Sequence, residues 1–215
     1  MSAVRPTAVR PVALAVALLL SACTGPGDGG TSGVDAAAAG PEPTGEVSVA
    51  PELLPLDQVP RDTREVATPV FALLAPAAFT ESERPGPGGI PMVVLSGDTA
   101  SPGAVVEVVA FSDPEPDAPV QEQMAGLVVS LVDVRRARDV SRQQVDWPGT
   151  SVAVVVRWTE DTAVAGGGSV TQTFTQLAVE TEDGRSATVI AVAPEEEFET
   201  SGALDVLRSF SVVQG

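Results

Sequence analysis

The sequence contains no histidine, no tyrosine and no lysine, and its only cysteine is Cys23. These absences exclude Ser-His-Asp triads, Cys-His and Ser-Lys dyads, Schiff-base lysines and histidine metal sites. No second cysteine is present for an internal disulfide, so packing must hold the fold together. Only carboxylates, hydroxyls and arginines remain for chemistry. We therefore expect a protein that is not an enzyme and that uses no cofactor.

The charge of the chain is strongly negative. All twelve basic residues are arginine, and the formal net charge is -17 at pH 7. Nucleic acid is an unsuitable partner for such a chain, because phosphate binding requires clustered positive charge. An acidic surface favours solubility. Aromatic residues make up only 4% of the chain, which leaves few side chains to line a sugar-binding cleft.

The first residues have the layout of a signal peptide. Arg5 and Arg10 are followed by the uninterrupted apolar run Val12–Leu20 and then by small residues. A positive start before a short hydrophobic core is typical of export signals. The run is too short to span a bilayer, which takes roughly 20 apolar residues. We expect residues 1–22 to be a cleaved leader.

The four residues Leu20-Ser21-Ala22-Cys23 resemble the lipobox of bacterial lipoproteins. The resemblance implies that a diacylglycerol is attached to the Cys23 thiol and that the chain is cut just before this residue. The expected partner is then the lipid bilayer, and the expected location is the outer face of the cytoplasmic membrane. The alternative is an ordinary secretory signal with an incidental cysteine.

Residues 23–65 are rich in glycine, proline, alanine and acidic residues, and they keep no helical or strand period. This composition predicts a disordered acidic tether, followed by a globular domain over residues 66–215. The apolar stretch Leu53-Leu54-Pro55-Leu56 is an exception. It could dock on the domain or bind a partner, and we favour docking.

Short β-branched runs bounded by turn residues predict strands in the domain. The expected strands are Val70–Leu74, Ile90–Leu95, Ala104–Phe111, Ser151–Thr159, Val170–Glu180 and Ser186–Ala193. Asp183-Gly184 is a two-residue hairpin signal between the last two, and Gly166–Gly168 is expected to be a flexible hairpin turn before the fifth.

Two helices are expected from the spacing of apolar residues. The first carries the stripe Val120, Met124, Leu127, Val128 and Leu131, with Ser112 or Asp113 as its cap. The second carries Leu204, Leu207 and Phe210, with Thr200 or Ser201 as its cap. The order β-β-β-α-β-β-β-α predicts an α+β fold in which an antiparallel sheet is packed against helices.

The sequences of several segments resemble those of LpqN-type lipoproteins of actinobacteria. The segments are Phe71–Phe79, Val145–Gly149, Thr173–Leu177 and Leu204–Phe210, together with the strand ending at Trp158. The resemblance implies a PsbP-like fold, an α/β/α sandwich with a central antiparallel sheet. It also implies a mostly non-enzymatic envelope lipoprotein, and it supplies no functional residue.

Two acidic clusters are candidates for carboxylate chemistry. Asp113, Glu115 and Asp117 alternate in one, and Glu195, Glu196, Glu197 and Glu199 form the other. Such acids could bind calcium or hydrolyse a glycan. We favour a simpler interpretation, in which both clusters precede helices whose N-terminal dipoles stabilise negative charge.

The basic cluster Arg135, Arg136, Arg138 and Arg142 could bind an anionic lipid headgroup or the acidic surface of a partner. We favour a solvated connection near the end of a helix.

Trp158 lies in phase with buried valines and is expected in the core. Trp147, beside Pro148-Gly149, is open to either interpretation, core or ligand platform.

The expected function is a membrane-anchored, non-catalytic binding or accessory module of the cell envelope. The alternative is a carrier or chaperone for a hydrophobic envelope ligand such as a lipid. A carrier needs a cavity between sheet and helix, which the small residues Ala187, Ala191 and Ala193 could leave. A carboxylate-based hydrolase of cell-wall glycan is a weaker alternative.

Overall fold

A computed structural model describes residues 53–135, 137–164 and 167–213. The expected leader, the expected lipidation site Cys23 and most of the expected tether lie outside these residues, as do Arg136 and Gly166. No helix in the described part of the chain is both long and apolar enough to cross a membrane.

Ten strands account for about half of the described residues, and short helices connect some of them. The strands are β1 (Thr63–Ala67), β2 (Phe71–Pro76), β3 (Thr80–Pro85), β4 (Pro91–Gly97), β5 (Val106–Asp113), β6 (Arg138–Gln144), β7 (Thr150–Ala163), β8 (Ser169–Thr181), β9 (Ser186–Pro194) and β10 (Ser211–Val212). The helices are η2 (Pro87–Gly89), α1 (Val120–Val129), the π-helical segment η3 (Ser130–Arg135), η4 (Glu195–Glu197) and α2 (Ala203–Arg208).

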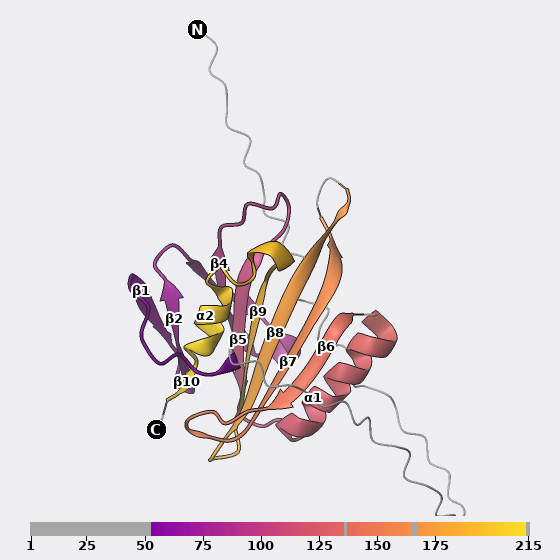
Figure 1. Cartoon of the computed structure of the whole chain (residues 1–215). Helices are drawn as coiled ribbons and strands as arrows, with labels where there is room; N and C mark the ends of the chain where they lie inside the picture. The colour runs from indigo at the N-terminus through magenta and orange to yellow at the C-terminus, as the bar shows by residue number, and fades with distance from the viewer. Residues whose placement is uncertain (1–52, 136, 165–166, 214–215) are drawn as a thin grey trace, which may run out of the picture.

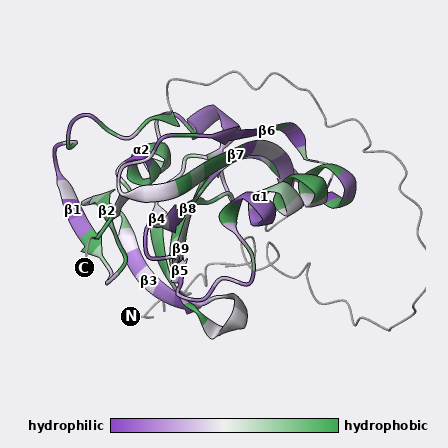
Figure 2. Cartoon of the chain, turned by 90° about the horizontal axis from the view of Figure 1, so that it is seen from below, coloured by the Kyte–Doolittle hydropathy of each residue, from purple (hydrophilic) through white to green (hydrophobic). Residues whose placement is uncertain are grey.

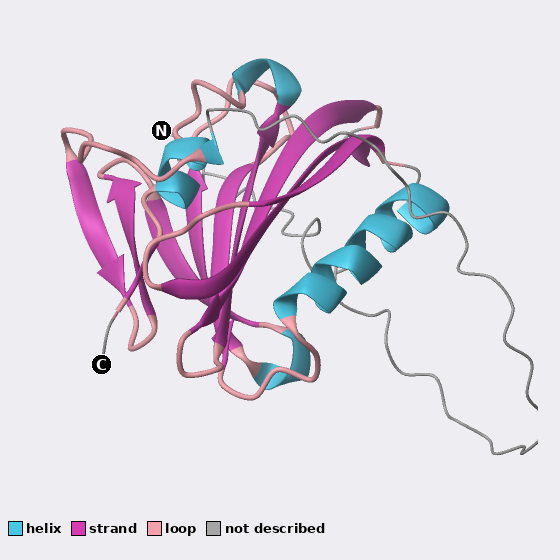
Figure 3. Ribbon diagram, turned by 60° about the horizontal axis from the view of Figure 1, so that its bottom comes forward, coloured by secondary structure: helices cyan, strands magenta, loops and turns pink. Residues whose placement is uncertain are grey.

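Seven of these strands form one twisted sheet in the order β3-β4-β5-β9-β8-β7-β6 (Figures 1 and 3). Every neighbouring pair is antiparallel. The centre of the sheet is built from β5, β7, β8 and β9, which are rich in valine and alanine. Strands with such β-branched residues on both faces suit a sheet that is covered on both sides.

The two faces of the large sheet carry different cores. On one face Val155, Leu177 and Val189 pack with α2 and with a small second sheet. On the other face Val156 and Trp158 pack with α1 and η3. Figure 1 shows α2 on one side of the sheet and α1 on the other. The structure thus confirms the predicted α+β class, with a central antiparallel sheet between helical layers.

The small sheet has the order β1-β2-β10 and joins the two ends of the domain. Phe71 of β2 packs against Phe210, with ring centroids 5.8 Å apart. Leu53 belongs to the same core at 5% exposure, and the Leu56 N–H donates to the Arg208 carbonyl at 3.1 Å. Docking of the apolar stretch is therefore confirmed, although Leu54 is half exposed.

The folded part consequently begins earlier than the expected boundary at residue 66. Leu53 is buried, and β1 starts at Thr63 and pairs along its whole length with β2. The stretch 53–65, expected as the end of a disordered tether, is part of the domain. Its end pairs with the next strand in a hairpin, and its start contacts Arg208 near the other end of the domain, which local composition does not report.

The six predicted strands and both predicted helices are present, but their ends differ from expectation. The N-cap of α1 is Pro119 and makes no side-chain cap bond, so Ser112 and Asp113 do not cap it. Asp113 is instead the last residue of β5. The N-cap of α2 is Gly202, and the Ala203 N–H is bound by the Ser201 hydroxyl at 3.3 Å.

The hairpin between β8 and β9 is longer than the predicted two-residue turn. The Thr181 N–H donates to the Arg185 carbonyl, and the Gly184 N–H donates back to Thr181. Three residues, 182–184, therefore form the loop. Gly184 has a φ of +82°, as expected for a glycine that follows a type I turn in a three-residue hairpin.

Candidate functional site at the end of helix α1

Helix α1 packs on the large sheet with the predicted stripe. Val120, Met124 and Leu131 are buried, while Leu127 and Val128 are partly buried. No glycine or proline stops the helix at its end, and Ser130 continues it in right-handed geometry. The chain then widens into the π-helical segment η3, which closes with an Ala137 N–H bond to the Leu131 carbonyl. Such segments are rare and often occur at functional sites.

Three valines at this end of the helix point into solvent. Val129, Val132 and Val134 are 59%, 52% and 77% exposed. The other large apolar side chains that are exposed in the described residues are Leu54 and Val59. We call the three residues the valine ridge. In Figure 2 the end of α1 shows hydrophobic segments on the outside of the protein. Exposed apolar residues that form a contiguous patch mark interaction surfaces, whereas single ones are normal.

The arginines next to the ridge are occupied by contacts within the protein. Arg135 forms an ion pair with Glu160, and Arg138 pairs with Asp161 at 3.0 Å. The Arg142 guanidinium donates to the Gln121 carbonyl at 3.1 Å. The predicted solvated connection is wrong for Arg138 and Arg142, because both lie in strand β6, which pairs with β7. Arg136 lies outside the described residues.

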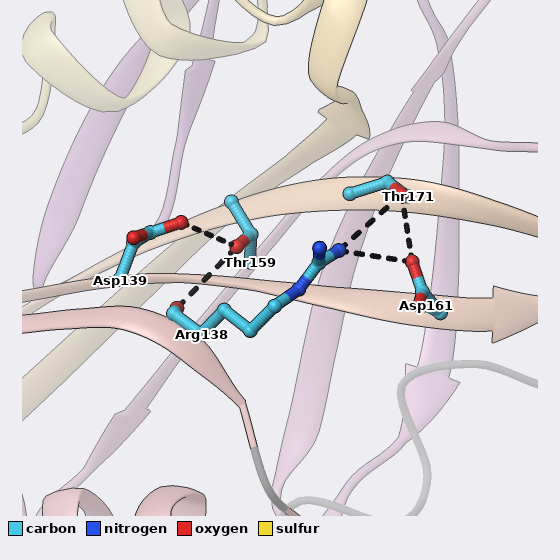
Figure 4. A network of polar contacts seen from close by, with 5 residues as sticks. All are labelled: Arg138, Asp139, Thr159, Asp161 and Thr171. Atoms are coloured by element: carbon cyan, nitrogen blue, oxygen red, sulfur yellow. Dashed lines mark hydrogen bonds and ion pairs between the residues drawn. The ribbon is translucent and has the colours of Figure 1, made fainter.

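A second network covers the opposite face of the same strand ends (Figure 4). Asp161 accepts bonds from Arg138 at 3.0 Å and from the Thr171 hydroxyl at 2.7 Å. The Thr159 hydroxyl is 3.2 Å from an Asp139 carboxylate oxygen and also reaches the Arg138 carbonyl. Asp139 has a φ of +52° in an irregular part of β6. β6 is an edge strand, and its free backbone groups could pair with another chain. The irregularity disrupts the regular backbone geometry that such pairing needs.

Glu160 is the titratable residue most affected by burial in this region. Its side chain is 15% exposed and that of Arg135 is 23% exposed. Burial raises the pKa of Glu160, because desolvation penalises the charged carboxylate, and the positive charge of Arg135 offsets part of this rise. The pair lies at the junction of η3 and β7, beside the buried aromatic core.

The two tryptophans are core residues. Trp158 is completely buried and stacks on Phe174, with centroids 5.0 Å apart and planes within 4°. This confirms the expectation for Trp158. Trp147, which the sequence left open, is 5% exposed and donates its Nε1–H to the Phe210 carbonyl at 3.0 Å. Neither ring offers an exposed face for a ligand.

The first acidic cluster begins at the last residue of β5 and continues into the segment before α1. The Asp113 carboxylate accepts the Glu115 N–H at 3.0 Å, which is a local turn contact. The acidic residue in the first turn of α1 is Glu122, so the interpretation of this cluster as the helix N-terminus is wrong. No group of three or more potential metal ligands occurs among the described residues.

The second acidic cluster holds two parts of the fold together. Glu197 binds the turn between β4 and β5, with the Ser101 hydroxyl at 2.6 Å. Glu199 pairs with Arg157 at 3.0 Å, and the Arg157 guanidinium lies 5.0 Å from the centre of the Phe198 ring. Hydrogen bonds lower the pKa of Glu197, those from Ser101 first, so it is an ionised structural acceptor. This is the opposite of the raised pKa that a glycosidase acid needs.

The alanines expected to leave a cavity are packed into the core. Ala187, Ala191 and Ala193 are at most 2% exposed and belong to the cluster between the sheet and α2. They allow α2 to approach β9 closely. A shallow cleft of about 330 Å³ lies elsewhere, within the β6–β7 loop between Gln144 and Ala153. Its lining mixes polar residues with Trp147 and Ala153, which belong to the core between the sheet and α2.

Comparisons with known proteins give a likeness at the level of the fold. No family model matches this sequence, and no curated protein matches it. The solution structure of cyanobacterial PsbP (CyanoP) from Synechocystis is similar to this chain with a TM-score of 0.45 and 14% sequence identity. The match covers 73% of this chain and 96% of the CyanoP chain. The α+β class of the chain rests on the strand order and layers described above.

Proposed function

We propose that the protein is an exported lipoprotein of the cell envelope that acts as a non-catalytic binding module. Lipidated Cys23 would anchor it to the outer face of the cytoplasmic membrane, and the domain from Leu53 onward would contact a partner. The lipobox-like residues and the resemblance to LpqN-type lipoproteins support this proposal. The observation that carries the binding role is the valine ridge.

A binding role fits the side chains that the fold leaves free. The sequence has no histidine, lysine or tyrosine, and several of its acidic residues are engaged in structural contacts. Glu107, Glu160 and Glu199 form ion pairs, and Glu197 holds a turn. These four carboxylates thus support the fold, whereas the side chains of the valine ridge are exposed.

The partner that suits the valine ridge is a protein with an apolar contact patch. A second copy of this chain and an anionic membrane are both disfavoured, because the chain carries a formal charge of -17. The arginines beside the ridge do not reverse this, since Arg135 and Arg138 are paired with acids. Apolar contact with a protein needs no compensating charge.

Site-specific photo-crosslinking in the native membrane tests the proposal. A photoreactive residue replaces Val132 in one variant and Val59 in a control, because Val59 is also an exposed valine, at 69%, but lies outside the ridge. We expect a discrete crosslinked protein from position 132 that is absent from position 59. Val132→Asp should abolish the same complex, when probed from position 129, without changing the melting temperature.

Crosslinks to lipid alone from position 132 would contradict a protein partner. Equal crosslinking from positions 59 and 132 would show that the ridge is not a specific surface. The variants are expected to fold, because substitutions at exposed sites usually change stability by no more than about 0.5 kcal/mol.

A further inference from the structure

On the sheet face below α1 and η3, Nε of Arg142 lacks a hydrogen-bond partner near the start of α1. Three further buried polar atoms lack a partner at the end of this face that lies under η3. They are Nη1 of Arg135, Nε1 of Trp158 and Oε1 of Gln172. Trp158 is 0% exposed and Gln172 is 1% exposed. Buried polar atoms are almost always satisfied, since an unmade bond leaves the full cost of desolvation. Such a group of atoms within one patch therefore points to a bound polar guest.

The strand register places these three side chains together. Glu160 lies directly opposite Gln172 in the β7–β8 ladder, and Trp158 lies opposite Phe174, one pair further along the same face. Diagonal neighbours on a ladder are within reach of aromatic and long side chains. Arg135 extends from η3 onto this position through its ion pair with Glu160. All four side chains thus occupy the same end of the sheet face.

The hydrogen-bonding capacity of the three atoms defines the guest. The Gln172 Nε2 donates to the Val105 carbonyl at 3.3 Å, so the amide orientation is fixed and Oε1 is the free acceptor. The Arg135 Nη1 and the Trp158 Nε1 are donors. Two donors and one acceptor are the complement of one hydroxyl oxygen, which accepts two hydrogen bonds and donates one. A carboxylate does not fit as well, because it cannot donate to Gln172 and would lie beside Glu160.

We propose that Arg135, Trp158 and Gln172 form a buried binding site for one hydroxyl oxygen, supplied by a small alcohol or by a water molecule. The cover of the site is the segment η3, in which Leu131 is the buried residue. The ion pair of Arg135 with Glu160 and the bond from the Ala137 N–H to the Leu131 carbonyl also hold this cover. A short segment of this kind can open locally, which gives a guest its way in. This inference is independent of the lipid anchor and of the valine ridge.

Nuclear magnetic resonance of the full chain labelled with ¹⁵N-tryptophan tests the site, because the sequence has two tryptophans. The Trp147 indole is bound to the Phe210 carbonyl and serves as an internal control. We expect glycerol to shift the Trp158 Nε1–H signal in a saturable way and to leave the Trp147 signal in place. If water is the guest, glycerol has no effect, and the Trp158 Nε1–H shows a nuclear Overhauser effect to a long-lived water.

Gln172→Leu removes the acceptor and keeps the size of the side chain. We expect this variant to lose the glycerol shift or the water contact at Trp158, while an unchanged Trp147 signal shows that the domain is folded. Absence of both effects in the parent protein would overturn the proposal. Equal shifts of both indoles with glycerol and no water contact would overturn it as well, since they would report a general solvent effect.

Discussion

Ser101 and Glu197 are joined by two hydrogen bonds that tie the turn between β4 and β5 to η4, the short helix that follows β9. The Ser101 hydroxyl donates to the Glu197 carboxylate at 2.6 Å, and the Ser101 N–H donates to the same oxygen at 3.0 Å. The Ala100 N–H and the Thr99 hydroxyl complete the set. One carboxylate thus replaces the backbone partners that this turn lacks.

Glu197→Gln should loosen this turn, because a neutral amide accepts hydrogen bonds more weakly than a carboxylate and presents only one oxygen. We expect faster hydrogen exchange at the amides of Ala100 and Ser101 and a lower melting temperature. Glu196→Gln is the matched control, since Glu196 is the adjacent exposed residue in η4. Equal exchange rates in the two variants would contradict the role given to Glu197.

Asp183 should make the protein sensitive to acid. Hydrogen bonds from Arg185, and then from Thr181, lower its pKa from 3.8 to about 2. A carboxyl group whose pKa is depressed by folding contributes stability above its unfolded pKa, and this contribution is lost as the pH falls through the folded value. The melting temperature should therefore fall between about pH 4 and pH 2 by more in the parent than in Asp183→Asn. Parallel pH profiles would contradict this.

The central part of the fold could be predicted from the sequence because its residues show a clear period. In β7 the alternation around Val154, Val156 and Trp158 places these side chains on one face, and the structure confirms it. The helical stripe of α1 is equally regular. In both elements burial decides the pattern, and the pattern is visible in the order of apolar residues.

The edges of the sheets could not be predicted, because edge strands bury little. In β3 the sequence Thr80–Pro85 has no apolar residue other than its last, and its side chains are mostly exposed. In β6 the basic residues suggested a solvated connection, yet pairing with β7 makes the segment a strand. Backbone pairing with the next strand along the chain defines these strands, and no apolar period records it.

The candidate site was missed for a related reason. The arginine cluster suggested available positive charge, but Glu160 and Asp161, more than twenty positions later, neutralise it. The position of Trp147 in the core likewise depends on a hydrogen bond to Phe210, which is 63 residues away. In the sequence, the valines of the ridge continue the apolar pattern of the helix. Only the structure shows that Leu131 is buried while these valines are exposed.

Leu53→Ala should destabilise the domain although the residue lies in the expected tether. Its side chain is 5% exposed within the core shared by the two sheets, and removal of a buried leucine typically costs about 2–5 kcal/mol. Leu54→Ala is the matched control. Leu54 is 50% exposed, so a change within about 0.5 kcal/mol is expected. Chemical unfolding of both variants measures the difference, and equal effects would show that residue 53 does not dock.

Cys23→Ala should release the protein from the membrane or block its processing. Two acyl chains give stable attachment to a bilayer, whereas one chain gives only marginal binding. Separation of membrane and soluble fractions, with the mass of the chain in each, measures the outcome. Thr24→Ala is the control, because it changes the next residue and leaves the thiol. If Cys23→Ala remains in the membrane fraction at its mature size, attachment does not depend on this residue, and the protein is held by a partner instead.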